Sequence, residues 1–403
     1  NKYIWANCLL MSLNKGKFMK QGNVEVLVRR ILGAGILSLV VSNAMADQSV
    51  IIGLAGPLTG PSARIGKDLE NGAQLAIDDV NKTHPVIDGK AVTFKLLSED
   101  DQSDPKVAVT VAQRLVDSGV AGVVGHWNTG TSIPAARIYH DAGIAQVAPV
   151  ATGHAYTEQG FDTSFRVMGH DDDGGNYAAQ YAVKNLQAKR IAVLDDGTAF
   201  GQGLADAFIK SLKAQGVTIV DREYIDDKTL DFSPVLTAIR SKNADLIFFG
   251  GVDSQAALLA RRIKQLDIKA TLMGAGGFVS QTFLSLAQKQ GDGVVALEPG
   301  LPLDKMPGGK AFDQQYRARY HYPIELHAPF AYDATRVLID AMEKANSVDP
   351  DKYLPVLHHI DYQGVTGEIS FDAQGNLKNP SFTVYKDINN QWQPVDVVGG
   401  KKS

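Results

Sequence analysis

The chain has 403 residues with 40 basic and 44 acidic side chains, which give a formal net charge of −4. An acidic balance argues against nucleic acid or an anionic membrane surface as the partner, because both select a basic face. The single cysteine, Cys8, lies in an N-terminal segment that we expect to be removed. The rest of the chain then offers no disulfide, no thiolate nucleophile and no cysteine metal site.

Residues 20–46 show a pattern typical of a secretory signal peptide. Basic Arg29 and Arg30 precede the apolar stretch 31–41, and the small-residue site Ala44-Met45-Ala46 follows. The apolar stretch is well short of the roughly 20 residues that a membrane-spanning helix needs. We therefore expect a periplasmic protein cleaved after Ala46, and we interpret residues 1–18 as an upstream extension.

The chain from Asp47 onward is long enough for two domains. It has 34 basic and 43 acidic residues, a net charge of −9. A chain of about 350 residues buries about three quarters of its unfolded surface and usually divides into two domains.

Short β-branched runs alternate with amphipathic segments of helical period, the pattern of βαβ units. The first series has predicted strands at 50–54, 92–97, 122–124 and 145–148, and predicted helices at 67–81, 105–118 and about 133–142. The second has predicted strands at 190–194, 218–224 and 245–249, and predicted helices at 203–215, 233–242 and 254–266. The sequence thus predicts an α/β fold with two doubly wound parallel-sheet units.

The two series meet near residues 168–173, where Gly169 and the cluster Asp171-Asp172-Asp173 interrupt the periodicity. We interpret this join as a solvated crossover turn rather than a calcium site, because no loop of alternating oxygen ligands surrounds it. After the second series, the sequence predicts helices at 310–320 and 331–345 and strands at 367–371 and 381–387.

Ligands of open parallel sheets sit beyond the carboxyl ends of the strands, so the loops there are the first candidates for a site. Three such loops, 56–61, 125–132 and 149–153, are rich in small polar residues. The second precedes a predicted helix with Pro134 in its first turn, and free backbone N–H groups at a helix start can hold a small carboxylate. Thr131 or Ser132 could equally serve only as the helix cap.

In several segments the sequence resembles the periplasmic branched-chain amino acid binding proteins of ABC transporters, the leucine/isoleucine/valine type. The resemblance runs from about Val50 to Tyr385. It is carried by GLAGPLTGP, GKDLENGAQLAIDDVN, SDPKVAVTVAQRLVDSGVAGVVGH, SIPAARIYHDAGIAQVAPVAT, TEQGFDTSFR, FGQGLADAF, DFSPVLTAIR and GEISFDAQGN.

The resemblance implies two α/β lobes joined by three crossover segments, with ligand trapped in the cleft between them. Lobe one would comprise residues 47–168 plus 300–376, and lobe two residues 169–299 plus 377–403. The implied protein is a monomer without cofactor or metal that delivers its ligand to an inner-membrane ABC permease. Hinge closure around the ligand is the usual motion of such proteins.

The resemblance also implies a set of ligand-binding residues. Thr129, within the stretch Trp127-Asn128-Thr129, and Thr152 match the family's carboxylate-binding positions. The carbonyl of Val150 would accept from the ligand's ammonium group, and Ile65 would line the side-chain pocket. Trp127 and Asn128 lie next to this site in the sequence.

In the second lobe the chain departs from the family's pattern. Phe200 replaces a tyrosine, and Val252 stands where an aromatic or polar residue is common. The loop Ala275-Gly276-Gly277 lacks the acidic residue that usually pairs with the ligand's ammonium group. A buried cation without that partner loses a charge-assisted bond of about 1.5–3 kcal/mol.

Two explanations for the missing acid remain open. Either a substitute carboxylate exists, for which Asp253 and Asp171 are the nearest candidates in sequence, or the ligand is a carboxylate without an ammonium group. For Asp253, a solvated helix cap is an equally good interpretation.

Other functions have weaker support in the sequence. The glycine-rich pieces 201–203 and 274–277 do not follow the spacing of a dinucleotide fingerprint. No nucleophile elbow occurs, and of the nine histidines only His358 and His359 are adjacent. We expect a periplasmic solute-binding protein for a small amino acid, not an enzyme; the alternatives are a binder of a non-amino carboxylate and a ligand-sensing receptor component.

Overall fold

The computed structural model describes residues 48–401. The predicted signal peptide and its cleavage site lie outside these residues. Among the helices of residues 48–401, none is both long enough and apolar enough to span a membrane.

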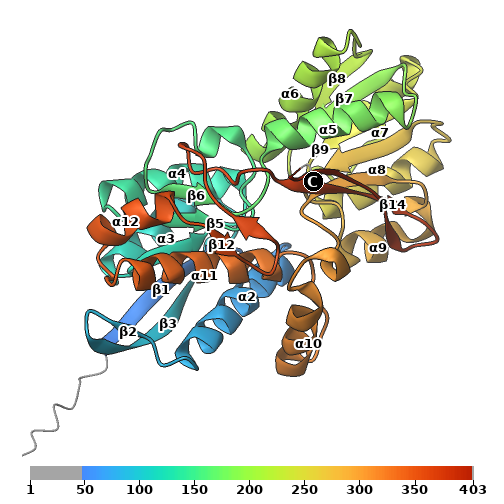
Figure 1. The fold of residues 1–403 in the computed structure, drawn as a ribbon. Helices are drawn as coiled ribbons and strands as arrows, with labels where there is room; N and C mark the ends of the chain where they lie inside the picture. The colour runs from blue at the N-terminus through green and yellow to red at the C-terminus, as the bar shows by residue number, and fades with distance from the viewer. Residues whose placement is uncertain (1–47, 402–403) are drawn as a thin grey trace, which may run out of the picture. The chain divides into compact units, whose positions relative to one another are not determined.

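The first sheet has six strands (Figure 1). Their spatial order is β2 (Val86–Ile87), β3 (Lys90–Asp100), β1 (Gln48–Gly56), β4 (Gly122–Gly125), β5 (Gln146–Ala148) and β6 (Ser164–Arg166). All neighbours are parallel except β2, which pairs antiparallel with β3. Its covering helices are α2 (Ala63–Asn81), α3 (Pro105–Asp117), α4 (Thr129–Asp141), α11 (Ala328–Lys344) and α12 (Pro350–His358).

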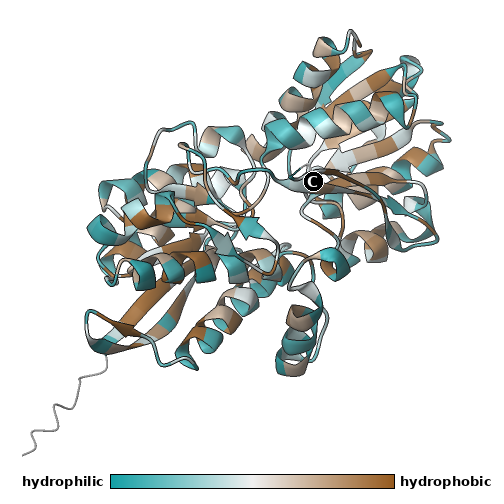
Figure 2. Ribbon diagram, viewed as in Figure 1, coloured by the Kyte–Doolittle hydropathy of each residue, from teal (hydrophilic) through white to brown (hydrophobic). Residues whose placement is uncertain are grey.

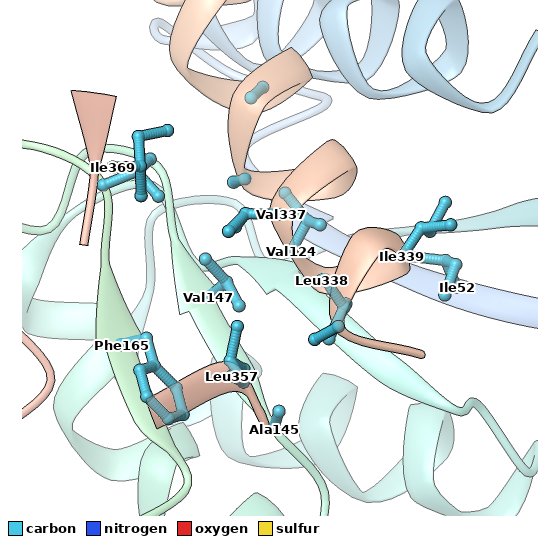
Figure 3. Close-up of a cluster of buried hydrophobic side chains, with 14 of the residues drawn as sticks. Ile52, Val124, Ala145, Val147, Phe165, Val337, Leu338, Ile339, Leu357 and Ile369 are labelled. Carbon is cyan, nitrogen blue, oxygen red and sulfur yellow. The ribbon is translucent and has the colours of Figure 1, made fainter. Parts of the chain in front are cut away.

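Successive residues of β4 face opposite sides of this sheet. Val124 belongs to a core that includes Val337 of α11 and Leu357 of α12 (Figure 3). Val123 packs with Leu115 of α3 on the other side. Burial on both faces explains why the strand is a continuous apolar run, as a parallel sheet between two helical layers requires.

The second sheet has seven strands. Their order is β15 (Trp392–Gly399), β14 (Ser381–Asp387), β11 (Val295–Pro299), β10 (Thr271–Ala275), β9 (Leu246–Gly250), β7 (Ile191–Asp195) and β8 (Asp221–Tyr224). Only β14 and β15 are antiparallel to their neighbours. The helices of this part are α5 (Asp171–Lys184), α6 (Ala199–Ala214), α7 (Ser233–Ser241), α8 (Asp253–Gln265) and α9 (Gln281–Ala287).

The strands of the second sheet are also buried on both faces. Phe248 of β9 stacks on Phe208 of α6, with ring centroids 3.8 Å apart, whereas Phe249 packs with Leu236 of α7 and Leu259 of α8. In Figure 2 the strands of both sheets are mostly hydrophobic, and the helices carry polar residues on their outer faces. The predicted α/β fold with two parallel-sheet lobes is therefore confirmed; the residues at which the chain crosses between lobes stay a prediction.

The predicted turn at 171–173 is wrong, because these residues form the first turn of α5. Gly174 and Gly175 lower the helix propensity of this segment. Gly175 is nevertheless required, since a Cβ there would lie 2.7 Å from the Ala207 Cβ and the Phe208 backbone nitrogen of α6. Three acids in a first turn are favourable at the positive end of a helix.

Several shorter elements were not predicted or were placed differently. The helices α9 and α12 and the strands β2, β6, β10, β11, β12 (Tyr362–Gln363) and β15 were not predicted. The strand expected at 218–224 begins at Asp221, and that at 367–371 is the two-residue β13 (Glu368–Ile369), paired with β12. The remaining elements are α10 (Gly309–Tyr320) and the 3₁₀ turns η1 (His154–Tyr156), η2 (Gln288–Gly291) and η3 (Leu303–Lys305).

Candidate functional site

A pocket with an empty volume of about 510 Å³ lies where loops from the carboxyl ends of both sheets meet. The first sheet's strands lead to Ile65, Trp127, Asn128, Thr129, Val150 and Thr152. The second sheet's strands lead to Phe200, Val252, Asp253, Gly276, Gly277 and Ser280. The segment before α11 adds Glu325, Leu326 and His327.

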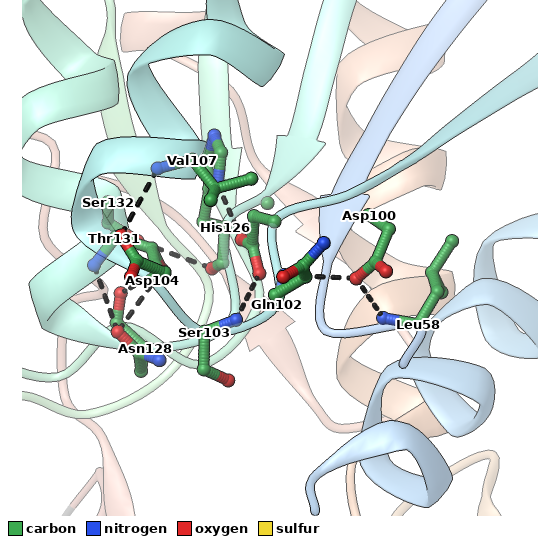
Figure 4. Close-up of polar contacts among 12 residues, drawn as sticks. Leu58, Asp100, Gln102, Ser103, Asp104, Val107, His126, Asn128, Thr131 and Ser132 are labelled. Atoms are coloured by element: carbon green, nitrogen blue, oxygen red, sulfur yellow. Dashed lines mark hydrogen bonds and ion pairs between the residues drawn. The ribbon is translucent and has the colours of Figure 1, made fainter. Parts of the chain in front are cut away.

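Ten of the eleven predicted site residues line this pocket, and their roles stay predictions. Asp171 is the exception. The polar loop 56–61 contributes nothing to the lining. Its backbone is instead held by Asp100, whose carboxylate accepts a hydrogen bond from Leu58 N at 2.8 Å (Figure 4). It also accepts one from Thr59 N at 3.3 Å.

Helix α4 begins at the pocket, and Asn128 is its cap. The Asn128 Oδ1 atom accepts a hydrogen bond from Thr131 N at 2.9 Å (Figure 4). The expectation that Thr131 or Ser132 caps this helix is therefore wrong, and Pro134 lies beyond the first turn of a helix that starts at Thr129. The first backbone N–H groups of a helix lack intrahelical partners and carry partial positive charge, so the pocket receives the positive end of α4.

The hydroxyl of Thr129 is oriented by the neighbouring loop. Its Oγ1 accepts a hydrogen bond from Gly153 N at 3.0 Å, which leaves the hydroxyl proton free to donate. The fully buried Arg166 holds that loop by donating to the carbonyls of Ala151 and Gly153, both at 2.9 Å. Thr129 and Thr152 are 1% and 3% exposed, so a ligand anion beside them would be removed from water.

Asp171 lies behind the pocket rather than in it. Its backbone N–H donates to the carbonyl of Thr152 at 2.9 Å. Burial raises the pKa of its side chain to about 7, against the lowering effects of Thr152 and Arg166. Asp171 is not among the residues that line the pocket, so its role as a partner for a ligand ammonium group stays a prediction, and its contact with Thr152 suits support of that loop.

Asp253 lies in the pocket wall at the first turn of α8 and is 6% exposed, so the solvated-cap interpretation is wrong. Its Oδ2 accepts a hydrogen bond from Ser280 Oγ at 2.5 Å, and its Oδ1 accepts from Ser254 N at 2.7 Å. Burial raises the pKa of Asp253, while the hydrogen bond from Ser280 opposes that rise.

The loop after β10 is held from behind by Glu298 of β11. One carboxylate oxygen, Oε1, accepts from the backbone nitrogens of Gly277, Phe278 and Val279 at 3.0, 2.8 and 3.1 Å. Gly276 adopts a φ of 70°, which glycine allows without strain. The loop therefore presents backbone, and no charged side chain, to the pocket.

The sequence analysis missed the residues before α11. Glu325, Leu326 and His327 line the pocket, and their backbone nitrogens donate to the carboxylate of Asp68 in α2 at 3.1, 3.1 and 2.8 Å. These residues follow a helix rather than a strand, so the expectation that ligands bind at loops beyond the carboxyl ends of strands did not identify them. The only signal in the sequence was a glutamate and a histidine within a short apolar run.

Glu325 and His327 both carry titratable side chains, and burial shifts their pKa values in opposite directions. Glu325 forms an ion pair with Arg64, and burial raises its pKa while Arg64 opposes that rise. Burial lowers the pKa of His327 to about 3, so this imidazole is neutral at physiological pH.

The rest of the lining is apolar and comes from both lobes: Ile65, Trp127, Val150, Phe200, Val252 and Leu326. Such a wall suits an aliphatic or aromatic group of a ligand. Within residues 48–401, no group of three or more His, Cys, Asp or Glu side chains is arranged to hold a metal ion.

Comparisons with known proteins agree with this architecture. The family model described as periplasmic binding protein matches residues 49–389. The chain is 33% identical over 374 residues to the Leu/Ile/Val-binding protein BraC3 of Rhizobium johnstonii, covering 92% of this chain and 99% of the relative. It is 32% identical over 368 residues to the leucine-, isoleucine-, valine-, threonine- and alanine-binding protein of Pseudomonas aeruginosa, covering 91% and 97%.

A solved structure shows the same fold. The branched-chain amino acid transporter substrate-binding protein LivJ of Streptococcus pneumoniae, in complex with isoleucine, superposes with a TM-score of 0.79. It is 27% identical, and the match covers 87% of this chain and 100% of that one. From its two sheets, its pocket and these matches, the chain belongs to the periplasmic binding protein family, among the relatives of the Leu/Ile/Val-binding proteins.

Proposed function

We propose that this protein is the solute-binding component of an ABC importer and that its ligand is a small amino acid of the branched-chain or a related type. The names of its relatives support this, since they bind leucine, isoleucine and valine. Membership of the periplasmic binding protein family implies a periplasmic location. We also propose that the protein is exported and cleaved after Ala46. It would act as a monomer and would bind its ligand without converting it chemically.

One observation carries the proposal: hydrogen-bond donors that suit a carboxylate and an apolar wall lie in the same pocket. The start of α4 and the hydroxyl of Thr129 offer donors for the ligand's carboxylate, with Thr152 beside them. Val252 and Leu326 belong to the apolar wall that would contact an aliphatic side chain. A zwitterion with a short apolar side chain satisfies both parts.

The proposed mechanism is a shift between open and closed forms. A ligand that contacts Thr129 in one lobe and Phe200 in the other stabilises the closed form over the open one. A ligand with equal affinity for both forms would shift nothing. The closed form would then dock on an inner-membrane permease.

Calorimetric titration of the refolded, ligand-free protein tests the ligand class. Leucine is compared with 4-methylpentanoate, which has the same skeleton without the ammonium group. Tight binding of leucine supports the proposal. Tight binding of 4-methylpentanoate alone would replace it with a non-amino carboxylate as ligand.

Uptake measurements separate transport from sensing. Deletion of the gene should abolish high-affinity uptake of the ligand by cells if the protein serves an importer. Unchanged uptake, together with loss of a response to the ligand, would show a receptor component instead.

A further inference from the structure

We propose that Asp253 and Glu325 together form the site for the ligand's cationic group, one carboxylate from each lobe. This inference rests on the proposed function and deepens it: the selected ligands carry a protonated amine as well as a carboxylate. It also accounts for the loop 275–277, which offers no acid.

The two carboxylates reach the pocket from different lobes. Asp253 is the first residue of α8, which packs against the second sheet. Glu325 precedes α11, which packs against the first sheet. Both side chains line the pocket, and the side chain of Glu325 is 9% exposed.

The charge on Asp253 has no cationic partner in hydrogen-bonding contact within residues 48–401. Its hydrogen bonds come from Ser280 and from the backbone of Ser254, which are neutral donors. Arg64 acts on Asp253 only through a longer-range attraction, the last of the effects on its pKa. A buried carboxylate with so little countercharge is costly, so an ammonium group bound there would stabilise the closed protein.

Glu325 is only partly compensated. Arg64 pairs with its Oε1 atom from a side chain that is 66% exposed, and Oε2 accepts no hydrogen bond from the described residues. Beyond burial, the negative charges of Asp68 and Asp253 raise the pKa of Glu325, and the backbone N–H of Gln281 lowers it by less. A ligand cation between Asp253 and Glu325 would relieve this repulsion.

The other buried acids near the pocket are less suited to this role. Oε1 of Glu298 accepts hydrogen bonds from three backbone N–H groups. The carboxylate of Asp68 accepts hydrogen bonds from the backbone N–H groups of residues 325–328 and from the hydroxyl of Tyr316. Neither lines the pocket. Asp253 and Glu325 are the two carboxylates among its lining residues.

Three ligands and two isosteric variants test the inference. The ligands are leucine, 4-methylpentanoate, and 3-methylbutylamine, which is leucine without its carboxylate. Asp253→Asn and Glu325→Gln should each weaken leucine binding about ten- to a hundredfold and leave 4-methylpentanoate binding unchanged or tighter. Asp267→Asn is the matched control, because that side chain lies just beyond the other end of α8 and is 78% exposed.

The outcomes separate this inference from the proposed function. If 4-methylpentanoate binds the unaltered protein while leucine and the amine do not, the carboxylate site stands and the cation site is wrong. If Asp253→Asn weakens the binding of leucine and of 4-methylpentanoate equally, Asp253 only positions Ser280 and the loop after β10. If the amine binds through Asp253 and neither carboxylate ligand binds, the cation site stands and the proposed function is wrong.

Discussion

The carboxylate of Asp68 in α2 accepts the backbone N–H of His327 at 2.8 Å across 259 positions of sequence. The same carboxylate accepts from Glu325, Leu326 and Ala328. A single side chain thus determines the path of the segment that supplies one end of the pocket.

Asp68→Asn should destabilise the protein and weaken ligand binding. The amide would turn two donors toward a cluster of backbone N–H groups, and an unsatisfied buried donor costs about 1–3 kcal/mol. Urea unfolding and calorimetry measure the two effects. Asp88→Asn, at a side chain that is 74% exposed, should change neither; normal affinity in Asp68→Asn would show that residues 325–327 do not contact the ligand.

Thr129→Ala should weaken leucine binding by about 1.5–3 kcal/mol if its hydroxyl donates to the ligand's carboxylate. Thr152→Ala should do the same. Thr129→Ser keeps the hydroxyl and should retain most of the affinity, and the exposed Thr110→Ala is the control. Wild-type affinity in both alanine variants would remove the proposed carboxylate site.

The stability of the protein should fall as pH rises from about 4.5 to 7. Burial raises the pKa of Glu298 to about 7 from its ordinary 4.5, so in this window the folded state holds a proton that the unfolded state has lost. Stability then decreases with pH, by at most about 1.4 kcal/mol per pH unit for one group. Asp171, with a pKa raised by burial to about 7, and Asp196 and Asp333, each raised to about 6, act in the same direction. His327 opposes them below pH 6.5, because burial lowers its pKa to about 3 and the unfolded state there holds a proton that the folded state lacks, but four raised carboxyl groups outweigh one histidine.

Glu298→Gln isolates one part of this effect. The amide oxygen can still accept from residues 277–279, but it cannot ionise. The variant should show a smaller loss of stability between pH 5 and pH 8 than the unaltered protein, measured as urea midpoints. An identical pH dependence would mean that Glu298 does not titrate in this window.

Two glycine substitutions in neighbouring helices should have opposite effects. Gly175→Ala places a methyl group 2.7 Å from backbone and Cβ atoms of α6, and such overpacking costs about 1–3 kcal/mol. Gly203→Ala in α6 meets no atom within 4 Å and should stabilise by about 0.5–1 kcal/mol. Differential scanning calorimetry of both variants is the measurement, and stabilisation by Gly175→Ala would contradict the close packing of α5 on α6.

Local patterns were sufficient for much of the fold and for most of the pocket. Alternation of apolar strands with amphipathic helices indicated two doubly wound sheets. Val150 lies in the polar loop after β5, where ligands of parallel sheets bind. The candidates in the second lobe came from the resemblance instead, and Asp253 was a candidate as an acid near in sequence to the position where the family's acid is missing. These features depend on residues close together in sequence.

Only the tertiary structure decided the remaining features, because they depend on partners distant in sequence. Helix α5 contains two glycines that local propensity counts against a helix, and contact with α6 makes one of them necessary. Glu325 and His327 reach the pocket because a carboxylate on α2 binds the chain before α11. Asp171 and Asp253 are each the first residue of a helix and each buried, so local sequence does not distinguish them; only the packing of the two helices places Asp253 and not Asp171 in the pocket lining.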